Sequence, residues 1–507
     1  MSAVYLIGAG PGDPGLLTLR GKALLERADV IVYDYLASDA LLAHARPDAE
    51  RVYVGKKAGL HALPQEEINR LLVAKAREGK TVARLKGGDP YIFGRGGEEA
   101  EALIDAGIPF EEVPGVTSTI AGPAYAGIPL THRDFASSVT LITGHERPDK
   151  PGSVHNWEAL AASANTLVFV MGMKNLPDIS ANLIRAGLAP DTPAALVHWG
   201  TTARHRSLVS TLEKLPAEAT AKGFVNPSVI IVGRVALLHD RLNWFERRPL
   251  FGRAVVVTRA REQASGLASR LEELGAEVIQ FPTIEIAPLP EYAEVDAAAR
   301  ELETWDWIVF TSANGVDAFW KRLAAVGRDS RAFGRARVAA IGPATAAALA
   351  ARGIRADFVP ESYVAESVAE GLCRTDEMRG RRVLIPRARQ ARDVLPEALT
   401  RAGAEARVLP VYETVPAAGR QDEVLAAIEA GRLFCVTFGS SSTVHNFFAR
   451  IPAEKLKEHP EVQLACIGPV TARTLEGYGL ACRIMPAEYT VPALAEAVAA
   501  AGREVRP

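Results

Sequence analysis

A glycine-rich turn near the N-terminus has the residue types of a ligand-binding loop. Residues 8–13 read Gly-Ala-Gly-Pro-Gly-Asp and join a strand-like run to a helical stretch. One interpretation is a dinucleotide site, because Asp34 ends the next strand at about the distance of a ribose-binding acid. However, Asp13 replaces the third glycine of that motif, and Pro11 removes a backbone N–H that a pyrophosphate would need. The loop therefore favours a different ligand.

Three further motifs place glycines and small residues at the ends of strand-like runs. They occupy residues 84–99, 113–118 and 127–133, and the first reads Arg-Leu-Lys-Gly-Gly-Asp-Pro before a second glycine cluster. Open α/β sheets bind their ligands at the carboxyl ends of their strands. We therefore expect these loops to meet the turn at residues 8–13 at one edge of a sheet.

Two polar loops in the second half of the chain resemble one another. Residues 311–315 (Thr-Ser-Ala-Asn-Gly) and 439–443 (Gly-Ser-Ser-Ser-Thr) each follow an apolar run and open a helical stretch. The simplest interpretation is helix capping, and a capped helix N-terminus with free N–H groups also attracts anions. Ser441 is not a nucleophile elbow, because the second glycine of that motif is missing. Two such loops suit a ligand with carboxylates on opposite sides.

The elements that must position these loops alternate between β-branched runs and helical stretches rich in Ala, Leu, Glu and Arg. This alternation predicts an α/β fold with largely parallel sheets. The pattern lapses between Leu237 and Gly252, and a new strand begins at Ala254. We expect two domains, at residues 1–245 and 252–507.

The second half contains an internal repeat. Residues 252–261 align with 380–389 at an offset of 128, whereas Ile341-Gly342-Pro343 align with an identical triplet at an offset of 126. Self-similarity of this length predicts two related α/β lobes. Lobes of this kind bind their ligand in the cleft between them.

The composition excludes several classes of protein. The 58 basic and 60 acidic side chains give a net charge of −2, so there is no basic excess to hold a nucleic acid. No apolar run reaches membrane-spanning length, and the first residues lack the features of a signal peptide. The four cysteines form no C-x-x-C pair, and no metal site is visible. We expect a cytoplasmic protein with structural thiols.

The motifs of the first half resemble the tetrapyrrole methylase family, and most closely its uroporphyrinogen III C-methyltransferases, over residues 3 to about 240. The glycine loops, Tyr33-Asp34, Val54-Gly55-Lys56 and residues 226–228 all fall in family order. The resemblance implies two α/β subdomains that hold S-adenosylmethionine between them, without a metal. It places the cofactor contacts at Pro11, Gly87, Gly88, Asp89, Ile92, Thr117, Ser118, Met171 and Gly200.

The resemblance also implies catalytic residues in this half. It marks Asp34 as a base and Lys56 as a proton donor, although a surface ion pair or a contact from Lys56 to a substrate carboxylate are alternatives. Asp89 suits the methionine ammonium, and Met171 suits the adenine, with plain core packing as its alternative. The substrate carries eight carboxylates, so further contacts are expected from Arg20, Lys57, Arg84, Lys86 and Arg95.

The second half resembles uroporphyrinogen III synthase from residue 253 to about 500. The matching segments are residues 255–259, 281–285, 310–315, 341–343, 409–414 and 437–441. The resemblance implies a two-lobed fold whose middle segment, about 285–415, forms one lobe. It also implies cofactor-free cyclisation of hydroxymethylbilane with inversion of ring D. Tyr412 is the candidate acid, with a structural role as its alternative, and the candidate substrate contacts are Thr311, Ser312, Thr437, Ser441, Arg259 and Arg387.

The two resemblances fit one pathway, because a synthase makes the uroporphyrinogen III that a methylase converts to precorrin-2. That product leads to sirohaem and cobalamin. The methylase resemblance also implies a homodimer formed through the first half. Two alternatives stay open. The methylase acts on another tetrapyrrole or on a protein residue, or the second half is a non-catalytic regulator that binds a carboxylate ligand.

Overall fold

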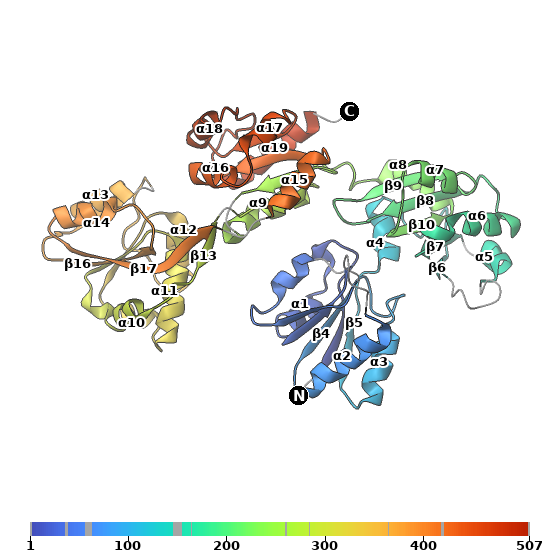
Figure 1. Ribbon diagram of the computed structural model, residues 1–507, viewed down its shortest axis with the longest axis horizontal. Coiled ribbons are helices and arrows are strands. Elements are labelled where there is room, and N and C mark those ends of the chain that lie inside the picture. Colours follow the sequence, from blue (N-terminus) through green and yellow to red (C-terminus); the bar gives the residue numbers. More distant parts are fainter. Residues whose placement is uncertain are drawn as a thin grey trace. The chain divides into compact units, whose positions relative to one another are not determined.

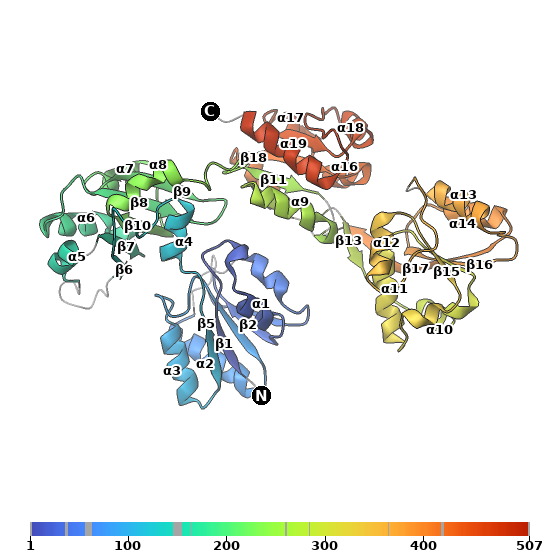
Figure 2. The same ribbon diagram turned by 180° about the vertical axis from the view of Figure 1, so that it is seen from behind.

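A computed structural model describes residues 3–35, 39–55, 63–145, 155–163, 165–258, 261–282, 284–362, 365–416 and 420–504. The chain forms two compact units. One comprises Met1–Val255 with Ser269–Val278 and Ala495–Pro507, and the other comprises Val256–Ala268 with Ile279–Leu494. The described residues form four sheets (Figures 1 and 2).

The first sheet is parallel and has the strand order β3-β2-β4-β1-β5. Helices α2 and α3 lie side by side against one face, and α1 packs on the other (Figure 1). The central strand β4 is buried along its whole length, as expected for a strand covered on both faces. The elements are β1 (Val4–Gly8), α1 (Leu19–Leu25), β2 (Val30–Tyr33), β3 (Glu50–Tyr53), α2 (Gln65–Arg77), β4 (Val82–Lys86), α3 (Gly96–Asp105) and β5 (Phe110–Val113).

The second sheet has the order β6-β7-β10-β8-β9 and is mixed. Only β6 and β7 pair in parallel, since β10 runs antiparallel to β7 and β8, and β8 runs antiparallel to β9. The expectation of largely parallel sheets is wrong here, because the loop from β8 to β9 is too short for a crossover connection. The elements are α4 (Ser118–Tyr125), β6 (Val139–Thr143), α5 (Trp157–Ser163), β7 (Thr166–Val170), α6 (Leu176–Arg185), β8 (Pro193–His198), β9 (Arg206–Thr211), α7 (Leu215–Ala221), β10 (Ser228–Val232) and α8 (His239–Leu242).

The two remaining sheets confirm the internal repeat. One has the order β12-β11-β18-β19, and the other has the order β13-β17-β16-β14-β15. The offset of 128 places β16 and β17 on β11 and β12, and the offset of 126 places β19 on β15. Figure 2 shows β11 beside β18, so chain from both ends of this half builds one lobe. The strands are β11 (Ala254–Val257), β12 (Glu277–Gln280), β13 (Ile284–Ala287), β14 (Trp307–Phe310), β15 (Arg337–Ala340), β16 (Arg382–Ala388), β17 (Glu405–Pro416), β18 (Leu433–Phe438) and β19 (Gln463–Cys466).

Corresponding helices of the two lobes also begin in the same way. Gly342 and Gly468 are the extended N-caps of α12 and α18, and each helix starts with a proline. Proline suits this position because its missing N–H has no helical partner there. The helices are α9 (Arg261–Glu273), α10 (Ala293–Arg300), α11 (Ala313–Ala325), α12 (Pro343–Ala350), α13 (Ala365–Thr375), α14 (Val394–Arg401), α15 (Gln421–Glu429), α16 (Ser441–Phe448), α17 (Ala453–Lys457), α18 (Pro469–Glu476) and α19 (Val491–Glu504).

Within the described residues, no helix is long and apolar enough to cross a membrane. All four cysteines are free thiols, with Cys435 and Cys466 buried and Cys373 exposed.

Candidate active sites

A cavity of about 990 Å³ lies where the glycine loops of the first half meet. Its volume falls at the upper end of the range typical of ligand sites. Loops at the carboxyl ends of β1, β2 and β4 contribute to one side, and loops after β7 and β8 contribute to the other. The walls include Pro11, Asp34, Tyr35, Gly87, Gly88, Ile92, Phe93, Thr117, Ser118, Met171, Trp199, Gly200, Arg204, Asn226 and Ser228.

Close backbone contacts explain the glycines at and behind one wall of this cavity. Gly10 and Gly88 exchange two backbone hydrogen bonds, of 3.2 and 2.7 Å, which join the loop after β1 to the loop after β4. A Cβ atom on Gly8 would lie 2.4 Å from the Cα atom of Gly115, and a Cβ atom on Gly115 would lie 2.2 Å from the Gly88 carbonyl oxygen. Only glycine permits this approach. The hydrogen-bonded amides of Gly10 and Gly88 thus shape the cavity.

Three non-glycine residues of the cavity wall have left-handed backbone conformations. The φ angles of Phe93, Met171 and Trp199 are 57°, 56° and 45°. Such conformations cost about 1–3 kcal/mol each and gather at functional sites. Met171 is nearly half exposed, so a ligand in the cavity can contact its side chain. These strained residues mark the cavity as a site kept for binding.

Eight of the nine predicted cofactor contacts line this cavity, and Asp89 does not. The Asp89 side chain is buried, and its carboxylate accepts hydrogen bonds from the backbone N–H groups of Tyr91, Ile92 and Gly115, at 2.8, 2.9 and 3.0 Å. Thr117 is the N-cap of α4, with its side chain accepting from the Thr119 N–H. The N-terminus of α4 therefore faces the cavity, where its dipole favours a negative group.

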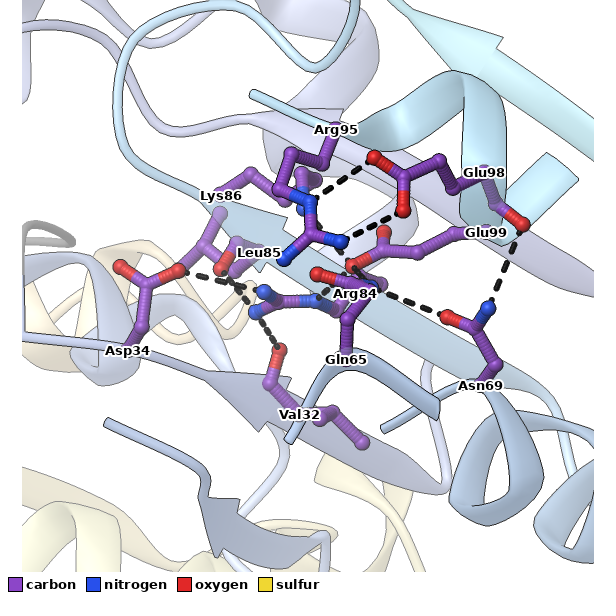
Figure 3. Close-up of polar contacts among 10 residues, drawn as sticks. All are labelled: Val32, Asp34, Gln65, Asn69, Arg84, Leu85, Lys86, Arg95, Glu98 and Glu99. Carbon is purple, nitrogen blue, oxygen red and sulfur yellow. Dashed lines mark hydrogen bonds and ion pairs between the residues drawn. The ribbon is translucent and has the colours of Figure 1, made fainter. Parts of the chain in front are cut away.

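The predicted base, Asp34, lies at the cavity wall directly after β2. Its Oδ2 atom is 3.2 Å from Nη2 of Arg84, and its side chain is about a quarter exposed. Figure 3 shows the Asp34 carboxylate beside the Arg84 guanidinium. The predicted proton donor, Lys56, lies outside the described residues. The assignments of both residues to catalysis stay predictions.

The predicted basic contacts of the first half lie in different environments. Arg84 and Lys86 are buried and contact the Glu99 carboxylate, whereas Arg20 and Arg95 form exposed ion pairs with Glu111 and Glu98. Lys57 lies outside the described residues. Burial, followed by repulsion from Arg84, lowers the pKa of Lys86 from its ordinary value, against the attraction of Glu99.

A second hollow of about 530 Å³ adjoins the cavity and shares Asp34, Tyr35 and Gly87 with it. Lys86 and Gly55 complete part of its lining. Asp34 therefore lies where the two spaces meet. The order of the glycine loops predicted the cavity, but it did not predict this adjoining hollow.

In the second half, the structure brings Ser312 and Tyr412 together in one lobe. Ser312 is the N-cap of α11, where its Oγ atom accepts a hydrogen bond of 3.0 Å from the Gly315 N–H. The same oxygen lies 3.3 Å from the hydroxyl of Tyr412, a residue that is 7% exposed. Thr311 immediately precedes this cap and is partly buried. Capping and the contact to Tyr412 thus coexist at Ser312.

The other described candidates of this half have partners of their own. The Thr437 side chain is buried between strands, donating a hydrogen bond to the Val256 carbonyl at 3.0 Å. Ser441 begins α16 and accepts from the Thr474 hydroxyl at 2.7 Å. The Arg387 guanidinium is buried and contacts Asp393, and Arg259 lies outside the described residues. Thr437 and Arg387 therefore contribute to packing, while a substrate role for any of the four stays a prediction.

Sequence reasoning missed three residues that the geometry singles out. Arg204 lines the cavity with its guanidinium 5.6 Å from the Trp199 ring centroid, but the chain has no motif around either residue. Glu99 is fully buried. Its burial could have been predicted from the sequence, because it shares the apolar face of α3 with Ala100 and Leu103. A carboxylate on such a face needs a buried partner. Among the described residues, no cluster of three or more His, Cys, Asp or Glu side chains is placed to hold a metal ion.

The fold and cavity define a two-part α/β enzyme with a glycine-lined ligand site, and the comparisons with known proteins specify its family. Residues 3–216 match the family model of tetrapyrrole (corrin/porphyrin) methylases, and residues 265–496 match that of uroporphyrinogen-III synthase HemD. The chain is 40% identical over 481 residues to the porphyrin biosynthesis protein HemD of Ruminiclostridium josui, which covers 94% of each chain. The chain therefore belongs to the family of tetrapyrrole biosynthesis proteins in which a methylase is fused to uroporphyrinogen-III synthase.

Two further relatives match mainly the first half. The uroporphyrinogen-III C-methyltransferase of Bacillus subtilis (strain 168) is 46% identical over 328 residues, which cover 65% of this chain and 67% of that protein. Siroheme synthase 2 of Cronobacter sakazakii is 54% identical over 245 residues, which cover 48% of this chain and 52% of that protein. Both expected resemblances, to the methylases and to the synthase, are thereby confirmed.

Proposed function

We propose that the chain cyclises hydroxymethylbilane to uroporphyrinogen III and methylates that product twice with S-adenosylmethionine, giving precorrin-2. The observation that carries the methylase proposal is the cavity, whose walls include eight predicted cofactor positions and the candidate base Asp34. The relatives named as a C-methyltransferase and a siroheme synthase support the sirohaem branch. The same product serves cobalamin synthesis.

S-adenosylmethionine would supply an activated methyl group, which moves from its sulfonium sulfur to a nucleophilic pyrrole carbon, and a proton then leaves the ring system. The strained Met171 and the N-terminus of α4, which begins at Ser118, would hold its adenosine and carboxylate ends. Asp34 would accept the proton released after methyl transfer. Lys56 is the candidate for donating a proton where a ring double bond shifts, a step that releases a second proton elsewhere on the ring. Arg204 is a further candidate for binding a carboxylate of the tetrapyrrole.

Asp89 takes a different role in this proposal. Because its carboxylate is occupied by three backbone N–H groups, it would hold the cavity loops in place while the ammonium group of the methionine binds elsewhere. In this role Asp89 is still needed for cofactor binding, although it does not contact the cofactor directly.

In the synthase half, Tyr412 would donate a proton to the departing hydroxyl of hydroxymethylbilane. The resulting cation closes through a spiro intermediate that inverts ring D. Orientation matters most here, because the free molecule closes unaided to isomer I. Thr311 and Ser312 would bind substrate carboxylates beside Tyr412, with Ser441, Thr437, Arg259 and Arg387 as further candidates. The Ser312–Tyr412 contact supports the assignments of Tyr412 and Ser312.

Further parts of the proposal concern organisation. We place the methylase at residues 1–245 and the synthase at 252–507, with the middle lobe at about 285–415. We also propose a cytoplasmic location and a homodimer formed through the methylase half.

The test uses the purified full chain with hydroxymethylbilane and S-adenosylmethionine, followed by chromatography and mass analysis of the oxidised porphyrins. We expect a dimethylated product of isomer III. Isomer I alone would refute the synthase assignment and favour a regulatory second half, whereas unmethylated isomer III would refute the methylase assignment.

A second test concerns the base. Asp34→Asn should lower the rate of methylation at least a hundredfold with little change in binding of S-adenosylhomocysteine, because the amide cannot take up a proton. Asp105→Asn, at the exposed end of α3, is the matched control and should keep the wild-type rate. A wild-type rate for Asp34→Asn would remove Asp34 from catalysis and leave the family assignment intact.

A further inference from the structure

Glu99 is a fully buried carboxylate beneath the candidate methylase site. Its position follows from the strand pattern, because Val82, Arg84 and Lys86 of β4 alternate onto the sheet face that α2 and α3 cover. Val82 packs against apolar side chains, whereas Arg84 and Lys86 bring cations to the same covered face. Helix α3 supplies Glu99 at this point, next to its apolar residues.

The contacts of Glu99 are concentrated on one oxygen atom. Oε1 accepts from Lys86 Nζ at 2.7 Å, from Gln65 Nε2 at 3.1 Å and from Arg84 Nε at 3.2 Å. Oε2 is buried and has no hydrogen-bond partner within the described part of the chain. A carboxylate held in this way costs free energy, since an unsatisfied buried oxygen is unfavourable. Its two cationic neighbours explain why the charge is tolerated.

Arg84 connects Glu99 to the cavity. Its Nε atom faces Glu99, its Nη2 atom lies 3.2 Å from Asp34 Oδ2, and Nη1 donates to the carbonyl groups of Val32 and Leu85 (Figure 3). Because a guanidinium group is planar and rigid, fixing one edge fixes the direction of the others. The position of Glu99 is thereby transmitted through Arg84 to the Asp34 carboxylate at the cavity wall.

We propose that Glu99 is a positioning residue for methyl transfer, which holds Arg84 and Lys86 and, through Arg84, orients the Asp34 carboxylate. This inference rests on the proposed function of Asp34 as the base. Glu99 does not line the cavity, so it acts only through other side chains.

The charges around Asp34 provide a readout that separates positioning from simple packing. Among the described residues, Arg84 contacts both Asp34 and Glu99, and Lys86 contacts Glu99, so charges of both signs meet at this point. The nearby charges of Arg95 and Glu98, on the exposed side, form a pair of their own. Neutralising Glu99 removes a negative charge from this cluster, which favours the charged form of a neighbouring carboxylate. Neutralising Lys86 has the opposite effect.

The experiment compares four full-length variants by the pH dependence of methylation, with KM and kcat measured separately. Glu99→Gln should lower kcat about tenfold through misplacement of Asp34, and should shift the acid limb of the profile about one pH unit lower. Lys86→Met should shift that limb higher. In the double variant E99Q/K86M the limb should return to the wild-type pH while kcat stays low. Glu101→Gln, an exposed change on the same helix, is the control and should match the wild type.

The outcomes separate this inference from the function on which it rests. If the wild-type chain methylates and E99Q has the same kcat and acid limb, Glu99 is only structural and the inference is refuted. If the wild-type chain does not methylate, the proposed function fails first. Should E99Q not fold, the charge-balanced double variant provides the test, and a wild-type kcat in that variant would refute the positioning role.

Discussion

The Asp89 carboxylate accepts a hydrogen bond of 3.0 Å from the backbone N–H of Gly115 and so ties the loop after β4 to the loop after β5. Two more backbone N–H groups, of Tyr91 and Ile92, donate to its other oxygen. Asp89 therefore closes its own turn and joins two walls of the cavity. The family resemblance predicts that this carboxylate contacts the cofactor, and the structure shows its hydrogen bonds to the protein backbone.

Replacing Asp89 with Asn distinguishes these two roles. The amide NH2 group cannot accept hydrogen bonds, so at least one backbone N–H loses its partner in a buried place. We expect Asp89→Asn to reduce the free energy of unfolding by about 1–3 kcal/mol and to weaken binding of S-adenosylhomocysteine. Thermal unfolding and calorimetric titration measure the two effects. Weaker binding with unchanged stability would instead support a direct contact.

The left-handed conformation of Met171 leads to a second prediction. Glycine adopts a φ of 56° without steric cost, and the Met171 side chain is nearly half exposed, so little burial is lost. Met171→Gly should therefore keep or raise the ligand-free melting temperature while lowering affinity for S-adenosylhomocysteine about tenfold. Val139→Gly, at an exposed strand position, is the control and should lower the melting temperature without changing affinity. A lower melting temperature for Met171→Gly would contradict the strain argument.

Much of the fold was predictable because it depends on local pattern. The repeat offsets of 128 and 126 identified corresponding strands of the two lobes, which the sheet orders confirm. The direction of β10 was not predictable, because strand pairing depends on which neighbours a strand meets and not on its own residues. The glycine loops predicted one meeting point, since strand ends gather at one edge of a sheet.

The residues of the site could be predicted where the backbone conformation determines their position. They could be predicted less well where the position depends on which other side chain or backbone group each side chain contacts. Gly87, Gly88 and Gly200 line the cavity as expected. Asp89 and Arg84 are charged residues beside that cavity, yet their partners are backbone N–H groups, Glu99 and Asp34. Sequence spacing gives the direction of a side chain along a strand, but the partner comes from a helix whose packing the spacing does not specify.

Glu246, near the end of the methylase half, provides a prediction about pH. Burial alone would raise its pKa, but interactions with His205, Ser207 and Asn243 outweigh burial and lower the pKa from 4.5 to about 2. Its carboxylate lies 2.5 Å from Ser207 Oγ, 2.7 Å from Asn243 Nδ2 and 3.0 Å from His205 Nε2. A carboxyl whose pKa is lower in the folded state stabilises the fold above its unfolded pKa.

We therefore expect Glu246→Gln to destabilise the chain by roughly 1–3 kcal/mol at pH 7. The difference from wild type should shrink as the pH falls from 4.5 towards about 2, because the wild-type carboxyl then becomes protonated. Melting temperatures across that range measure it. Glu66→Gln, an exposed residue paired with Arg70, should change stability by less than about 0.5 kcal/mol. A difference for Glu246→Gln that does not depend on pH would show that packing, not charge, is responsible.

The last prediction concerns the Ser312–Tyr412 pair of the synthase half. Tyr412→Phe removes the phenol that we propose protonates the departing hydroxyl, so the cyclisation rate should fall about 10- to 100-fold. The share of isomer I should rise, because unaided ring closure then competes with the enzyme. Ser312→Ala loses the cap of α11 and should cost about 0.5–2 kcal/mol of stability as well as activity. Tyr292→Phe is the matched control, because the Tyr292 hydroxyl accepts a hydrogen bond from the Leu289 N–H at 3.0 Å in the same lobe and has no assigned role in catalysis. Its rate and isomer ratio should match the wild type. A Tyr412→Phe enzyme that still makes isomer III at the wild-type rate would show that the synthase acts by orienting its substrate, without proton donation from this phenol.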